Sequence, residues 1–203
     1  MKRLVSFSLV LLLIIGLTGC ANKTKYINSD DVKESTMLAR SNGSLQVATV
    51  EKFDKKYYNL TELNDFIGKE VVAYNDTIKA ENIKINKIDV REVEGVKCAV
   101  MLLSYASMKD YSEFNSVMAA YFHGGVKNVT FELPEKLVNA KHEVLTNTSD
   151  VIENTGFRVL VVTEPLHIVV DGKVQFYSEN VKKIDGNEVR SSAEGMSVIV
   201  YKP

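Results

Sequence analysis

The chain has 203 residues and a formal net charge of −1, from 25 Lys and Arg against 26 Asp and Glu. This near balance offers no electrostatic attraction to a polyanion, so we expect no binding to nucleic acid. Hydrophobic residues make up 45% of the chain and charged residues 25%, with only 11 Gly and 3 Pro, which excludes collagen-like and low-complexity proteins.

The first twenty residues have the pattern of a secretory signal that ends in a cysteine. Lys2 and Arg3 precede an apolar run over residues 4–17, which is shorter than the roughly 20 residues that span a bilayer. The run closes with Leu17-Thr18-Gly19-Cys20, which resembles the bacterial lipobox. In proteins with this motif the cysteine is acylated and becomes the first residue after cleavage.

The lipobox resemblance implies a lipoprotein signal peptide over residues 1–19 and a lipid on Cys20. Acyl chains on Cys20 would hold the protein on the extracytoplasmic face of the cell membrane, which makes the membrane its first partner. Cys98 is then the remaining thiol, so we expect no internal disulfide.

Residues 20–44 are polar with scattered apolar residues, and we interpret them as the lipidated cysteine followed by a flexible tether. A flexible chain of about 24 residues spans roughly 25–30 Å. A short helix over residues 32–38 is the alternative within this stretch. We expect residues 45–203 to form a single domain.

In the first half of this domain, the sequence predicts a helix flanked by two strands. Leu45, Val47 and Thr49 alternate as in a strand. Asn59 and Glu62 have the spacing of a capping box, and apolar residues then recur every three or four positions as far as residue 78, which predicts an amphipathic helix of about 20 residues. Residues 83–90 predict the next strand.

A turn and a second helix follow. Glu94-Gly95 predicts a turn before an apolar strand over residues 97–105. Residues 108–122 predict a helix that opens at Ser107, includes Tyr121 in its apolar stripe and ends at Gly124-Gly125.

Strands dominate the remainder of the chain, with candidates at 126–133, 157–163 and 196–201, whereas residues 135–156 fit either a short helix or a loop. Asp171-Gly172 predicts a two-residue hairpin, because type I′ turns need positive φ at both positions. A second such pair is Asp185-Gly186. Two amphipathic helices packed on a mainly antiparallel sheet define an α+β fold.

Several short stretches occur together in this chain and resemble one family. They are Ala48-Thr49-Val50-Glu51-Lys52-Phe53-Asp54-Lys55-Lys56-Tyr57-Tyr58, Glu164-Pro165-Leu166, Gly172-Lys173, Ser178-Glu179-Asn180-Val181 and Ser192-Ala193-Glu194-Gly195. With the lipobox, they resemble a group of small, uncharacterised lipoproteins of clostridial-type Gram-positive bacteria. The resemblance covers most of the mature chain and implies a surface lipoprotein, without supplying an active site.

The sequence contains no nucleotide-binding glycine motif and no nucleophile elbow. Its histidines, His123, His142 and His167, are far apart, and Cys98 lies in the pattern of a buried strand. We interpret His167 as a core or edge residue opposite Phe176. We therefore expect no catalytic residue, no metal and no cofactor, and interpret the protein as a non-enzyme.

Tyr57 and Tyr58 are the candidate partner-binding residues, because one of two adjacent side chains must point away from the face on which the helix packs. We expect a binding or interaction module at the cell envelope, whose partner is another envelope protein or a small ligand. The alternative is an envelope hydrolase or carbohydrate-active enzyme that uses carboxylates in residues 135–156 and 178–195.

Overall fold

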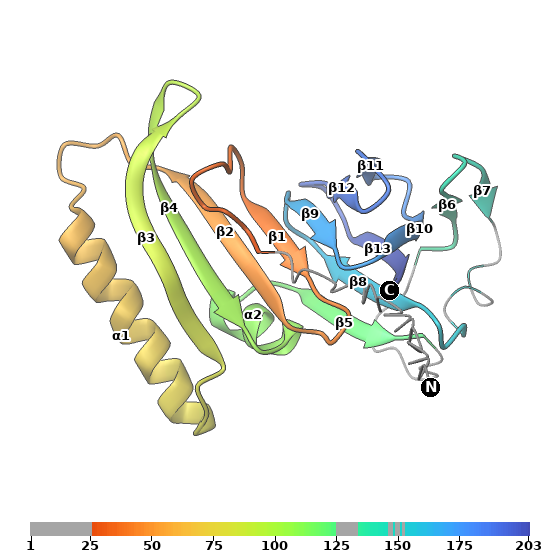
Figure 1. Cartoon of the computed structure of the whole chain (residues 1–203), viewed down its shortest axis with the longest axis horizontal. Helices are drawn as coiled ribbons and strands as arrows, with labels where there is room; N and C mark the ends of the chain where they lie inside the picture. The colour runs from red at the N-terminus through yellow and green to blue at the C-terminus, as the bar shows by residue number, and fades with distance from the viewer. Residues whose placement is uncertain (1–25, 125–133, 146–147, 149–150, 152) are drawn as a thin grey trace, which may run out of the picture.

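A computed structural model describes residues 26–124, 134–145, 148, 151 and 153–203. In this part of the chain the fold is mostly β, with thirteen strands in two sheets and two helices (Figure 1). The expected α+β fold, with two helices packed on one antiparallel sheet, is therefore wrong. The signal peptide, Cys20 and the strand expected at 126–133 lie outside the described residues.

Sheet A has seven strands in the order β11-β12-β9-β1-β2-β4-β3. Its members are β1 (Thr36–Ala39), β2 (Leu45–Lys52), β3 (Ile83–Val93), β4 (Val96–Tyr105), β9 (His167–Val170), β11 (Lys182–Lys183) and β12 (Glu188–Arg190). Sheet B has six strands in the order β5-β8-β13-β10-β6-β7. Its members are β5 (Ala119–His123), β6 (Leu137–Asn139), β7 (Val144–Leu145), β8 (Arg158–Val162), β10 (Lys173–Tyr177) and β13 (Ser197–Lys202).

The main core lies between the two sheets. Successive residues of a strand point to opposite faces, so Met37 and Val47 of sheet A face inward, where they join Leu160 and Ile199 of sheet B in one buried cluster. We call this side of sheet A its inner face. The outer face carries a smaller cluster that includes Ala48, Val100 and Leu102.

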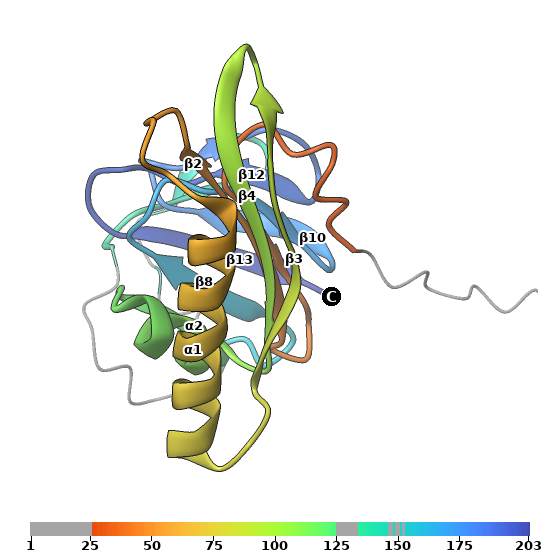
Figure 2. The same cartoon turned by 90° about the vertical axis from the view of Figure 1, so that its left-hand side faces the viewer.

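Helix α1 (Leu60–Ile78) confirms the helix expected after Asn59. The Asn59 side chain caps it by accepting bonds from the backbone N–H groups of Thr61 and Glu62. The helix packs along β3 on the inner side of sheet A, and Val71 is its one fully buried residue (Figure 2). Among the described residues, no helix combines the length and the apolar character needed to cross a bilayer.

The second helix is shorter than the sequence predicts. Helix α2 (Met108–Asn115) ends where Ser116 adopts a left-handed conformation and Val117 N–H donates to the carbonyl of Ser112. Tyr121, which we assigned to the helical stripe, lies in β5 and pairs with Leu160 of β8. The pairing with β8 is compatible with the sequence because the aromatic residues Tyr121 and Phe122 suit a strand as well as a helix face.

The predicted tether contains a central strand of sheet A. Residues Thr36–Ala39 form β1, which pairs antiparallel with β2 and parallel with β9, and all four are buried. The described fold therefore begins well before residue 45. The short apolar run at Met37-Leu38-Ala39 was its signal in the sequence, but four residues are too few to reveal a period.

Asp171-Gly172 joins the two sheets and does not form a hairpin. The strand before it, β9, pairs with β1 and β12 in sheet A, whereas the strand after it, β10, pairs with β13 and β6 in sheet B. His167 consequently lies beside Thr36 and Arg190, and the expected pairing with Phe176 is wrong. The hairpin expected at Asp185-Gly186 is present between β11 and β12.

The two Asp-Gly turns provide a matched test of this crossing between sheets. A Cβ atom at Gly172 would overlap the backbone carbonyl of Lys202, whereas a Cβ at Gly186 meets no atom within 4 Å. We expect Gly172→Ala to lower the free energy of unfolding by about 1–3 kcal/mol, because the backbone of β13 must move. Gly186→Ala should change it by less than about 0.5 kcal/mol. Equal effects in urea denaturation would contradict this account.

Candidate functional site

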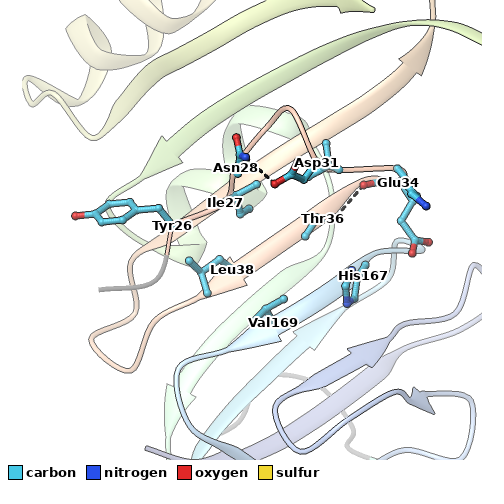
Figure 3. Close-up of a pocket in the computed structure, with 11 residues that line it drawn as sticks. Tyr26, Ile27, Asn28, Asp31, Glu34, Thr36, Leu38, His167 and Val169 are labelled. Carbon is cyan, nitrogen blue, oxygen red and sulfur yellow. Dashed lines mark hydrogen bonds between the residues drawn. The ribbon is translucent and has the colours of Figure 1, made fainter. Parts of the chain in front are cut away.

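A cavity of about 530 Å³ lies on the outer face of sheet A. Its roof is the N-terminal segment, by which we mean residues 26–34, and its floor is formed by β1 and β9 (Figure 3). Its volume falls within the range of roughly 300–1,000 Å³ that is usual for small-molecule sites.

The parallel pairing of β1 with β9 builds the floor. Thr36 is in register with His167, and Leu38 is in register with Val169, so these four side chains lie on the same face. Figure 3 shows them together beneath the N-terminal segment. Leu38 and Val169 make this end of the floor apolar, and Leu38 is buried beneath the segment.

Basic side chains of β3 fasten the N-terminal segment over the outer face. The Arg91 guanidinium donates to the backbone carbonyls of Ser29 (2.8 Å) and Val32 (2.6 Å). Lys87 pairs with the carboxylate of Asp30. The hydrogen bond from Lys87, together with its positive charge, lowers the pKa of Asp30, so this ion pair persists below the pH at which an ordinary aspartate is protonated.

Apolar contacts complete the roof. Val32 is buried and Ile27 partly buried against Ala48, Val100 and Leu102 of the outer face. The backbone N–H of Ile27 also donates to the side-chain oxygen of Gln46 at 3.2 Å. The segment is thus held by hydrogen bonds and by burial, which leaves the cavity as the space that its own side chains do not fill.

Charged groups gather at one end of the cavity. His167 Nε2 lies 3.2 Å from a carboxylate oxygen of Glu188. On the neighbouring residues, Arg190 Nε donates to Glu34 at 3.0 Å, and a second contact makes this a two-point ion pair across 156 residues of sequence. In Figure 3, His167 and Glu34 mark this end and Tyr26 the other, with Leu38 between them.

This arrangement suits binding of a group with an apolar body. The apolar centre removes such a group from water, and the imidazole and carboxylates at one end can position a polar atom. Within the described ranges, no three His, Cys, Asp or Glu side chains gather as a metal ion would require.

Tyr57 and Tyr58, the candidate partner-binding residues from the sequence, lie outside this cavity. Tyr57 is 76% exposed and Tyr58 40% exposed, and their rings meet edge to face at 5.0 Å between centroids. They line a shallow groove with Phe66 and Met101, and Met101 packs against the inner-face cluster. Tyr57 and Tyr58 are therefore on the opposite side of sheet A from the cavity.

The structure also places Cys98, His123 and His142, which the sequence analysis considered. Cys98 is buried among the apolar residues of the outer face, as expected. His123 lies at the end of β5 and not at a helix end, because α2 stops at Asn115. His142 Nδ1 lies 3.0 Å from the Tyr177 hydroxyl.

Sequence reasoning missed the cavity because both of its walls were misassigned. The roof and β1 were interpreted as tether, and His167 was placed opposite the wrong strand. Alternation in His167-Ile168-Val169-Val170 indicated a strand but could not indicate β1 as its neighbour.

Comparison of the chain with protein-family models, with curated proteins and with solved structures found no match. Any function must therefore be argued from the site itself.

The hydrogen bonds by which Arg91 holds the N-terminal segment can be tested by substitution. Arg91→Met keeps the aliphatic stem but removes the donors to Ser29 and Val32, which leaves two carbonyl groups without these partners. We expect amide hydrogen exchange in residues 26–34 to accelerate roughly tenfold or more. Lys84→Met is the control on the same strand, because among the described residues the Lys84 ammonium forms only an exposed pair with Glu81. Unchanged exchange in Arg91→Met would contradict the proposed fastening.

Proposed function

We propose that this protein is a lipid-anchored binding protein of the cell envelope whose cavity holds a small, mostly apolar ligand. The observation that carries the proposal is the cavity of about 530 Å³ between the N-terminal segment and the β1–β9 floor. The lipobox at residues 17–20 supports the anchor, with Cys20 as the acylated residue and the extracytoplasmic membrane face as the location.

The charged partners at the cavity favour binding over hydrolysis. A hydrolase of the kind considered above needs two carboxylates that face a substrate across a cleft. Of the carboxylates that line the cavity, Glu34 is paired with Arg190 and Asp31 accepts a hydrogen bond from the Asn28 side-chain amide. Glu188, which lies beside the cavity, contacts His167. These pairs support a role in shaping one end of a binding site.

Ligand binding is testable by thermal shift. The chain from residue 21 onward contains every described element and can be screened against fatty acids, lysolipids, sugars, peptidoglycan fragments and amino acids. A ligand at 100 times its Kd adds about 2.7 kcal/mol, or about 5–10 °C in Tm for a domain of this size.

Variants on two strands of sheet A locate the binding site. Val169→Phe fills the cavity from its floor and should abolish the shift. Val96→Phe, at an exposed position of β4 outside the cavity, should retain it. The proposal fails if no compound stabilises the protein, or if Val169→Phe responds as the unmodified chain does.

Substituting each of the two cysteines in turn tests the lipid anchor. In a Gram-positive host, we expect Cys20→Ala to abolish incorporation of a labelled fatty acid and to move the protein from the membrane to the soluble fraction. Cys98→Ala should keep both the label and the membrane location, because Cys98 is buried in the domain. A labelled, membrane-bound Cys20→Ala protein would disprove acylation at this residue.

A further inference from the structure

The cavity lies close to the proposed point of membrane attachment. Five residues separate Cys20 from Tyr26, where the described fold begins and the roof of the cavity starts. Six peptide steps reach at most about 20 Å. An acylated Cys20 would therefore hold the outer face of sheet A near the bilayer, in contrast to the 25–30 Å expected from a flexible tether.

The end of the cavity nearest the anchor carries an exposed aromatic side chain with a cation beside it. Tyr26 is 70% exposed, and the Arg40 guanidinium lies 5.4 Å from the centre of its ring. Tyrosine with a nearby cation is favoured at the level of lipid headgroups, because the ring is amphipathic and the cation attracts phosphate. Helix α1 lies on the other side of sheet A from the N-terminal segment (Figure 2). Tyr57 lines a groove with Met101 on that same side.

The cavity offers a mainly apolar path between its two ends. Ile27 and Val32 of the roof and Leu38 and Val169 of the floor line it. The polar Asn28, Asp31 and Thr36 lie among them, and His167 and Glu34 lie at the far end (Figure 3). A flexible hydrocarbon chain can follow such a path from the interface inward, because each methylene that is buried adds a similar favourable contribution to the free energy of binding.

We propose that the ligand of this cavity is a single acyl chain of a lipid, taken up on the membrane-facing side of the domain. This inference rests on the proposed binding function and names its ligand class. The argument combines three features of the molecule: the apolar path, the Tyr26–Arg40 pair at one end, and the short connection to Cys20.

The chain contains no tryptophan, so one introduced tryptophan reports on its own surroundings. Tyr26→Trp places the reporter at the cavity, and Tyr57→Trp places a control at an equally exposed aromatic position on the other side of sheet A. Both proteins, comprising residues 21–203, are titrated with mid-chain brominated dodecanoic acid and with the lysophospholipid that carries the same brominated chain, each below its micelle concentration.

We expect bromine to quench Tyr26→Trp fluorescence saturably and to leave Tyr57→Trp fluorescence unchanged. Quenching by the fatty acid alone assigns the site to free fatty acids, whereas quenching by both compounds assigns it to the chain of a headgroup-bearing lipid. Adding Val169→Phe to Tyr26→Trp should weaken binding at least about tenfold, the loss expected when two methylenes lose their contacts. Adding Val96→Phe should leave the affinity unchanged.

Two results would contradict the proposal that the ligand is an acyl chain. The first is equal quenching of the two reporters, which indicates unspecific adsorption of the lipid. The second is that neither lipid quenches the fluorescence, while a non-lipid compound of the thermal-shift panel binds and Val169→Phe abolishes that binding. In that case the proposed binding function holds, but its ligand is not an acyl chain. If no compound of any class binds, the proposed function and this inference fail together.

Discussion

The pairing of β1 on both of its edges is the constraint on which the rest of the structure depends. This four-residue strand joins β2 to β9 and so connects the first part of the chain to residues 167–170, about 130 positions later. Met37 and Ala39 enter the core between the sheets, and Thr36 and Leu38 point to the outer face. Because all four residues are buried, both faces of the strand need a cover. Sheet B covers the inner face, and the N-terminal segment covers the outer one.

The cavity follows from the way in which the outer cover is attached. Arg91 and Lys87 of β3 hold the middle of the N-terminal segment, and Arg190 of β12 holds its end through Glu34. These polar contacts hold the segment at its middle and at its end, and the cavity between it and the β1–β9 floor is left for another group. The proposed acyl chain would occupy this cavity.

Local patterns predicted some elements to within a residue or two. Asn59 and the spacing of apolar residues after it located α1, and Glu94-Gly95 located the hairpin of β3 and β4, where both turn residues have positive φ. The same reasoning extended α2 by seven residues, because Tyr121 and its neighbours fit a helical stripe and a strand equally well. It directed attention to Tyr57 and Tyr58, which are both exposed and whose role in binding stays a prediction, but it did not reach the cavity on the other side of sheet A.

The sequence by itself determined the features that depend on residues close together in the chain: the lipobox pattern, the start of each helix and the positions of the turns. Caps, turns and side-chain periods act over fewer than about ten residues, so they can be recognised without a fold. Only the tertiary structure decided which strands are neighbours, why Asp171-Gly172 links two sheets, and that residues interpreted as tether form β1 and the roof of a cavity. Those outcomes depend on burying apolar faces contributed by segments more than a hundred residues apart, and no local pattern encodes that partner choice.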